Sequence, residues 1–169
     1  NLQFDDCVWG GMVDAKMATA LTGRNGQALE DYKKRLLKLN NQVVAQAPED
    51  LVINTHVCRG NYHSTFFSSG AYDSVADLLF GEENVNAYYL EYDDKRSGGF
   101  APLAKVSGDK KVVLGLITTK IPQLEDKGKV IARIHEAEKY VPLDRLYLSP
   151  QCGFASCEIG NKLTEEEQW

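Results

Sequence analysis

Two side chains that zinc prefers as ligands lie two residues apart within residues 51–61. His56 offers an imidazole and Cys58 a thiol, and both groups bind zinc in proteins. The stretch is apolar and β-branched up to Gly60, which predicts a buried strand. Because side chains alternate along a strand, His56 and Cys58 should point to the same side of it. Taken alone, however, a His-x-Cys pair is more often a packed cysteine beside a buried histidine than a metal site.

Two further ligand types lie where other strands are expected to end. One predicted strand stops at Glu91 and another stops at Cys152. If the strands are parallel, their carboxyl ends share one edge of the sheet, which would gather His56, Cys58, Glu91 and Cys152. One nitrogen, two sulfurs and one carboxylate oxygen make a complete ligand set for zinc. The sequence therefore predicts a metal centre at this edge.

The elements that must position these residues alternate along the chain. Predicted strands lie in residues 2–6, 51–61, 85–90, 111–118 and 144–153, and predicted helices in residues 29–47, 71–80 and around 130–137. The first of these helices is the clearest, because apolar residues recur at helical spacing until Pro48. Near-continuous apolar strands that alternate with amphipathic helices indicate an α/β fold with a parallel sheet buried on both faces.

Polar residues at the carboxyl ends of such strands are typical of active sites in (β/α)₈ barrels. Asp5 falls at this edge as well. A whole barrel needs eight strands and about 250 residues, whereas the 169 residues here predict five strands. We therefore expect residues 1–169 to be part of a catalytic barrel, with the first strands missing. The capping box at residues 164–167 predicts the start of another helix.

The composition argues against several classes of protein. The net charge of −5, with acidic and basic residues interspersed, lacks the basic footprint of a nucleic-acid or anionic-membrane partner. No apolar run approaches the roughly 20 residues of a membrane span. Four cysteines, Cys7, Cys58, Cys152 and Cys157, are too sparse for a secreted disulfide scaffold. A cytoplasmic protein with reduced thiols is expected.

The spaced motifs resemble those of a known family. Residues 55–58 (Thr-His-Val-Cys), the strand ending in Glu91, and residues 149–153 (Ser-Pro-Gln-Cys-Gly) are similar, in the same order, to the zinc motifs of cobalamin-independent methionine synthase. The short, single-barrel bacterial and archaeal relatives are the most similar. Residues 2–6 resemble the family's strand that carries an aspartate for the amino group of homocysteine. The resemblance covers nearly the whole chain and implies about the last five strands of a (β/α)₈ TIM barrel.

This resemblance implies both the site and the reaction. It implies zinc ligands at His56, Cys58, Glu91 and Cys152, and it implies that Asp5 binds the substrate ammonium group. The implied activity is zinc-dependent transfer of a methyl group to the thiol of homocysteine, which forms methionine. Zinc would deprotonate a thiol that is mostly protonated at neutral pH. Glu91 is the hardest ligand of a sulfur-rich set, so we expect it to move when substrate sulfur binds.

Two positions depart from the family pattern, and they leave the donor open. Ile117 stands where full-length synthases carry a histidine linked to proton delivery, and Gln151 stands where they usually carry aspartate. Methyltetrahydrofolate, or its polyglutamate, is one donor to consider, beside a methylated corrinoid protein and a small methyl–sulfur compound. Another thiol acceptor such as coenzyme M, and a non-catalytic zinc-stabilised domain, are the alternatives; Asp5 and Glu91 favour the amino-acid thiol.

Other residues near the predicted mouth have weaker roles. Asn61, Arg59 and Arg96 are expected to support the ligands or a substrate carboxylate, although solvated loop positions are an equal expectation for the arginines. Packing in the core or at the rim is a stronger expectation for Trp9 and Tyr62 than stacking on a pterin. The remaining thiols, Cys7 and Cys157, are expected to pack rather than react.

Overall fold

A computed structural model describes residues 1–23, 25–155 and 157–169. Its strands are β1 (Leu2–Asp5), β2 (Ile53–Val57), β3 (Ala87–Glu91), β4 (Lys111–Ile117) and β5 (Leu146–Pro150). Its helices are α1 (Cys7–Met12), α2 (Ala15–Thr22), α3 (Gly26–Val44), α4 (Ala76–Glu82), α5 (Lys127–Glu138) and α6 (Glu165–Gln168). Short 3₁₀ helices are η1 (Tyr72–Ser74), η2 (Lys95–Ser97), η3 (Ala101–Lys105) and η4 (Leu143–Arg145).

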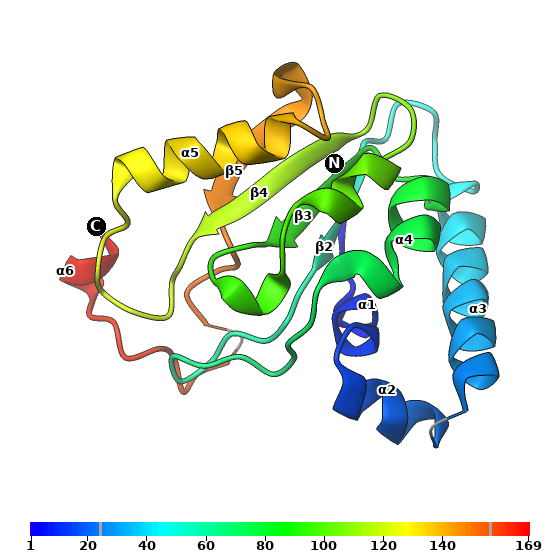
Figure 1. Cartoon of the computed structure of the whole chain (residues 1–169), viewed down its shortest axis with the longest axis horizontal. Helices are drawn as coiled ribbons and strands as arrows, with labels where there is room; N and C mark the ends of the chain where they lie inside the picture. The colour runs from blue at the N-terminus through cyan, green and yellow to red at the C-terminus, as the bar shows by residue number, and fades with distance from the viewer. Residues whose placement is uncertain (24, 156) are drawn as a thin grey trace.

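The five strands form one sheet in the order β1-β2-β3-β4-β5, and each neighbouring pair is parallel. Figure 1 shows the strands running side by side, with α4 near β2 and β3, α3 on the outer side of α4, and α5 along β4. The predicted α/β class and parallel sheet are therefore confirmed.

The two faces of the sheet carry different side chains. One face meets the helices, where Val57, Tyr88 and Leu114 join Leu37 of α3 and Leu79 of α4 in a single apolar core. Since side chains alternate along a strand, the register then sets a row of residues on the other face. That row contains Asp5, His56, Tyr89, Val113 and Tyr147.

The edges of this sheet are open within the described residues. Strands β1 and β5 each pair with one neighbour, and both are mostly exposed. The side chains of Leu148 and Tyr147 in β5 point to opposite faces of the sheet, and they are 48% and 47% exposed. Both faces of β5 are therefore exposed. Burial on both faces, as predicted, holds for the central strands β2, β3 and β4 and is wrong for the two edges. The edge strands lack neighbours that would cover them.

Helix starts follow capping side chains. Asp6, Asp14 and Asn25 accept hydrogen bonds from backbone N–H groups in the first turns of α1, α2 and α3, as N-cap residues do. The sequence predicts no element for α1 and α2, because helices of six and eight residues are too short to show a periodic pattern. The capping box of Thr164 and Glu167 is present. Among the described residues, no helix combines the length and apolarity needed to cross a membrane.

Candidate metal centre

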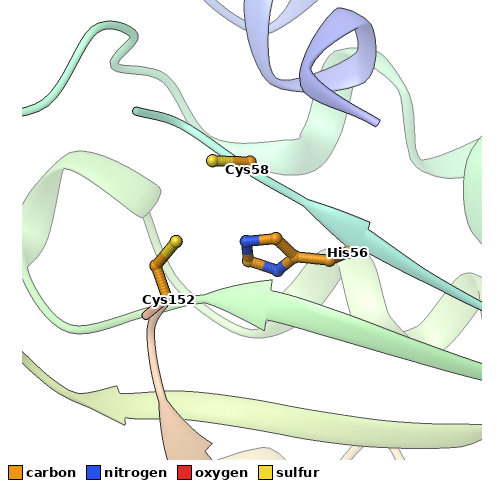
Figure 2. A group of neighbouring side chains, drawn as sticks. All are labelled: His56, Cys58 and Cys152. Carbon is orange, nitrogen blue, oxygen red and sulfur yellow. The ribbon is translucent and has the colours of Figure 1, made fainter. Parts of the chain in front are cut away.

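Three of the predicted ligands converge at the carboxyl edge of the sheet. The ligand atoms of His56, Cys58 and Cys152 all lie within 4.8 Å of one another. His56 lies on β2, Cys58 follows that strand, and Cys152 follows β5. Figure 2 shows the two thiols on the same side of the imidazole ring of His56. The edge therefore brings together one nitrogen and two sulfurs from segments almost a hundred residues apart.

The imidazole of His56 is oriented by the neighbouring strand. Its Nδ1 lies 3.3 Å from the carbonyl oxygen of Tyr89. A carbonyl can only accept, so in the neutral imidazole Nδ1 is the nitrogen that carries the proton and Nε2 the one with a free lone pair. Nε2 is buried and has no hydrogen-bond partner among the described residues. A buried polar atom without a partner is costly, and a metal ion at the two thiols would satisfy it. Metal-binding histidines are commonly oriented in this way.

The thiols form a coupled pair beside this ring. A hydrogen bond from the Cys58 thiol lowers the pKa of Cys152 to about 4, with further lowering from His56. The same hydrogen bond raises the pKa of Cys58, and burial adds to the rise. Burial lowers the pKa of His56, but the adjacent Cys152 thiolate and the carboxylates of Glu91 and Asp5 outweigh it and raise the pKa. One thiolate next to an imidazole is therefore available at neutral pH.

Glu91 lies beside this group rather than within it. Its fully buried carboxylate accepts hydrogen bonds from the backbone N–H of Arg59 at 2.6 Å and from the guanidinium of Arg96 at 2.5 Å. Burial raises the pKa of Glu91, against the lowering effect of these donors. Glu91 nevertheless contributes to the raised pKa of His56 and Cys58. Glu91 therefore lies next to the ligand cluster, bound to the N–H of the residue that follows Cys58. Its role as a metal ligand stays a prediction.

A buried set of charges holds Glu91 in place. The Arg96 guanidinium also contacts Asp94 and lies 3.1 Å from Asp93, whose second oxygen lies 2.6 Å from the Lys120 ammonium group. Arg96 in turn stacks on the ring of Phe66, with its guanidinium carbon 4.7 Å from the ring centroid. Arg96 is therefore a support for Glu91, one of the two roles that the sequence suggests for it.

The Arg59 side chain lies away from the mouth. It is fully buried, with its guanidinium carbon 4.2 Å from the centroid of the Tyr72 ring. The guanidinium donates hydrogen bonds to the carbonyl of Gly70 and to the hydroxyl of Tyr72. It is the backbone N–H of Arg59 that reaches the site, through Glu91. A solvated arginine in a loop, the alternative for this residue, is wrong.

Asn61 links the loops that carry the ligands. Its amide nitrogen donates to Thr119 at 3.0 Å and to the Gly153 carbonyl at 2.5 Å, and its oxygen accepts from Asn161. Gln151 accepts from the backbone N–H of Thr119 at 2.8 Å and donates to its hydroxyl at 2.9 Å. These bonds tie together the segments after β2, β4 and β5. The amide at position 151 suits this role because it both accepts and donates.

Asp5 and Cys7 border the same cluster on the β1 side. The Asp5 carboxylate lies 3.9 Å from His56 Nε2, and Asp5, Cys7 and Cys58 form a second group of ligand atoms within 4.8 Å of one another. Cys7 and Cys157 are both exposed, so the prediction that they pack is wrong. The place of Cys7 beside the site was not predicted from the sequence. The feature of the sequence that could have indicated it is the position of Cys7, two residues after Asp5 and at the carboxyl end of a strand.

A pocket opens from the cluster onto the face of the sheet that the helices do not cover. It has a volume of about 450 Å³ and is lined by residues that include Asp5, His56, Tyr89, Gln151 and Cys152. The pocket is thus large enough for a small amino acid beside the ligand atoms. Of the two aromatic residues considered for a pterin, Trp9 is fully buried in the core and Tyr62 is 45% exposed.

Comparisons with known proteins agree with this geometry. Residues 19–165 match the family described as cobalamin-independent synthase, catalytic domain. Two uncharacterized proteins of Bacillus subtilis (strain 168), YxjG and YxjH, are 46% and 47% identical over 169 residues, which are 99% of this chain and 44% and 45% of theirs. A methionine synthase of Pyrococcus abyssi (strain GE5 / Orsay) is 27% identical over 101 residues, 60% of this chain and 26% of its own.

Solved structures show the same architecture. A protein of Listeria monocytogenes assigned as a vitamin-B12-independent methionine synthase superposes with a TM-score of 0.72 at 36% identity, over 99% of this chain and 43% of its own. A B12-independent methionine synthase of Shewanella sp. W3-18-1, solved in complex with selenomethionine, gives a TM-score of 0.65 at 17% identity, over 99% of this chain and 44% of that chain. The second likeness shows the fold alone.

The described residues hold a five-stranded parallel sheet with a polar carboxyl edge, an architecture similar to part of the TIM barrel of a B12-independent methionine synthase. The chain belongs to the cobalamin-independent methionine synthase family, matching its catalytic domain. The family predicted from the spaced motifs is therefore confirmed. The chain spans about half the length of the curated relatives that it matches, 44% and 45% for the two from Bacillus subtilis.

Proposed function

We propose that the protein containing this chain is a zinc-dependent methyltransferase that methylates the thiol of homocysteine and so forms methionine. One observation carries the proposal. A buried His56 Nε2 without a hydrogen-bond partner faces two cysteine sulfurs, with the Asp5 carboxylate on the open side. This combination fits a metal ion and an amino acid bound next to each other.

The donor set of the described residues fits zinc. His56, Cys58 and Cys152 supply one nitrogen and two sulfurs, and we propose Glu91 as the fourth ligand. When bound, zinc supplies Lewis acidity that lowers the pKa of a substrate thiol and holds the thiolate. Glu91 already has alternative partners in Arg59 and Arg96. This supports the expectation that Glu91 is the ligand that yields its position to the substrate sulfur.

The protein's own residues prepare the site in three ways. The Tyr89 carbonyl fixes the His56 tautomer, and the Gly60 N–H lies 3.4 Å from the Cys58 sulfur, where it stabilises negative charge. The Asp5 carboxylate binds the ammonium group of homocysteine and thereby orients the thiol toward the cluster. The thiolate sulfur then takes the methyl group from the donor, and the donor leaves with the bonding electron pair.

The methyl donor is proposed as a class only. Methyltetrahydrofolate, a methylated corrinoid protein and a small methyl–sulfur compound all present an electrophilic methyl group. Ile117 ends β4 beside the site, and its side chain cannot deliver a proton to a leaving group. A donor whose leaving group needs no proton is compatible with that residue, whereas a folate would need a proton from elsewhere. The reduced thiols further fit our proposal of a cytoplasmic enzyme.

Assays with the full-length protein test this function. Each donor would be paired with homocysteine and, separately, with coenzyme M, and methylated thiol would be measured. The proposal predicts that homocysteine is preferred because Asp5 binds its ammonium group, which coenzyme M lacks; a preference for coenzyme M would overturn the choice of acceptor. Asp5→Asn should reduce kcat/KM for homocysteine and leave any activity with coenzyme M unchanged.

X-ray absorption separates a catalytic centre from a structural zinc site. A catalytic zinc accepts an exogenous ligand, whereas a structural zinc is closed by its protein ligands. Adding homocysteine to the zinc-loaded protein should introduce a new Zn–S bond at about 2.3 Å and remove one oxygen. An unchanged spectrum would favour the non-catalytic, zinc-stabilised alternative.

A further inference from the structure

Cys7 supplies a third thiol at the site that the proposed mechanism does not use. Its sulfur, a carboxylate oxygen of Asp5 and the sulfur of Cys58 all lie within 4.8 Å of one another. Cys58 therefore belongs to two groups of potential ligand atoms, one with His56 and Cys152 and one with Asp5 and Cys7. The second group lies on the exposed side, because Asp5 and Cys7 are both exposed.

The backbone holds Cys7 against Cys58. Asp6 caps α1 through the N–H of Val8 at 3.2 Å, so the helix begins at Cys7 directly after β1. Gly10, one turn later, packs on the chain after β2, where an added Cβ would lie 2.3 Å from the carbonyl oxygen of Cys58. Only a residue without a side chain permits this approach. The proximity of the two thiols thus follows from close helix–strand packing and not from one side-chain rotamer.

The negative charge of Asp5, and of Cys7 as a thiolate, favours the binding of a cation. A divalent ion held by His56, Cys58 and Cys152 would be neutralised by the two thiolates, and the charge of Glu91 is balanced by Arg96, which leaves Asp5 uncompensated. Among the described residues, the ion-pair partner of Asp5 is His56, whose Nε2 lies 3.9 Å from the carboxylate. A His56 that binds a metal ion through Nε2 must be neutral, so it cannot balance the charge of Asp5. A cation bound by the Cys7 thiolate and Asp5 would balance both negative charges. A thiolate sulfur that binds one metal ion keeps lone pairs for another, so Cys58 can be shared.

We propose that Asp5, Cys7 and Cys58 form a second site, for a soft divalent cation such as Zn²⁺, with Cys58 bridging to the first. The inference rests on the proposed function insofar as Cys58 is also a ligand of the first ion. Zn–S bonds of about 2.3 Å and Zn–O bonds of about 2.0–2.2 Å place two sulfurs and one oxygen in a tetrahedral site roughly 3.5–3.8 Å apart. Atoms within 4.8 Å therefore need to close by about 1 Å, which the two exposed side chains can do by rotation. Two sulfurs select zinc over magnesium or calcium.

The second site has a consequence for the first. An ion held by Asp5 removes the carboxylate that we propose for the ammonium group of homocysteine. Occupation of the outer site should therefore oppose substrate binding while the inner ion stays in place. The outer site keeps an open position beyond its three protein ligands, where water or a small thiol can bind.

Metal stoichiometry tests this site without an activity measurement. The metal-free, reduced full-length protein would be titrated with Zn²⁺, freed of unbound ion by gel filtration in zinc-buffered solution, and analysed for zinc by elemental mass spectrometry. We expect two zinc ions per wild-type chain and one per chain of Cys7→Ser or Asp5→Asn. Cys157→Ser is the matched control, because Cys157 is an exposed cysteine outside both groups, and it should retain two.

The outcomes separate the two proposals. One zinc in the wild type, or two in Cys7→Ser, would overturn the second site. If His56→Ala and Cys152→Ser still bind two ions while Cys7→Ser loses one, the second site stands and the proposed inner centre fails. Circular dichroism of each variant ensures that a lost ion reflects a lost ligand and not an unfolded chain.

Discussion

The Nδ1 atom of His56 lies 3.3 Å from the carbonyl oxygen of Tyr89, its register partner on the adjacent strand. This contact favours the tautomer with the proton on Nδ1 and leaves Nε2 facing the sulfurs of Cys58 and Cys152. A backbone carbonyl cannot be removed by mutation, so the orientation is built into the pairing of β2 with β3. The metal-binding geometry thus depends on sheet register as much as on ligand identity.

Cys58→Ser and Cys152→Ser in the full-length protein should each abolish tight zinc binding at the inner site. The reason is that serine stays protonated at neutral pH and offers no thiolate. Equilibrium dialysis against a zinc buffer measures the effect, with Cys157→Ser as the control. Loss of zinc in Cys157→Ser as well would require the ligand at the end of β5 to be reassigned.

Gly115→Ala should weaken zinc binding although it removes no ligand. An added Cβ would lie 2.7 Å from the Cα of Gln151 and 2.7 Å from the carbonyl oxygen of Leu90. The chain before Cys152 must therefore shift away from β4 and carry this ligand out of position, and loss of correct ligand orientation typically costs about 10- to 100-fold in metal affinity. Gly99→Ala is the control, because nothing lies within 4 Å of a Cβ there. Equal zinc affinity in both variants would show that the position of Cys152 tolerates such a shift.

Arg96→Ala should destabilise the protein by about 3–5 kcal/mol, the range for removing one partner of a buried charge pair. Arg96 and Glu91 side chains retain 5% and 0% of their exposure, so Glu91 would be left charged and buried. Glu91→Gln in the Arg96→Ala background should recover part of this loss. Chemical denaturation of the four proteins of the double-mutant cycle measures the coupling; purely additive effects would argue against a direct pair.

Stability should fall as the pH rises from about 5 to about 7, because of Glu83. Burial raises the pKa of this carboxyl group to about 7, so the folded state binds a proton that the unfolded state has already released. The contribution is present at low pH and is lost as the pH passes through the folded pKa, by about 3 kcal/mol in total. Glu83→Gln keeps an acceptor for Asn40, which donates to Glu83 at 2.6 Å, and should flatten this part of the pH profile.

Urea denaturation at pH 5 and pH 8 measures the change, and Glu82→Gln, on the exposed neighbour, should leave the profile as in the wild type. A steep wild-type profile that persists in Glu83→Gln would assign the pH dependence to another group.

We propose that the open edges of β1 and β5 are completed by further strands of a longer polypeptide, about twice this length. Residues 1–169 expressed alone should therefore self-associate or be poorly soluble, and should lack methyl transfer to homocysteine, because unpaired parallel edges invite pairing. Solution mass and an activity assay beside the full-length protein test this. A stable, active monomer of these residues would contradict the proposal.

Much of the fold could be predicted from the chain itself. Apolar runs that end in polar residues located all five strands, and the apolar spacing before Pro48 located α3. These signals are local, because strand alternation and helix periodicity are written in consecutive residues. The ligand types His56, Cys58 and Cys152 could be recognised for the same reason, because they stand at the carboxyl ends of two strands, β2 and β5.

Only the tertiary structure decided which of these residues meet. It brought Cys152 of the fifth strand against the second, turned the Glu91 carboxylate to Arg96, and placed Cys7 beside Cys58. It also buried the Arg59 side chain against Tyr72, although its place in the sequence suggests a loop at the mouth. Such contacts depend on strand order and register and on the approach of α1 to the chain after β2 at Gly10. These contacts are set by packing between segments that are distant in sequence, so they cannot be predicted from a local pattern of residues.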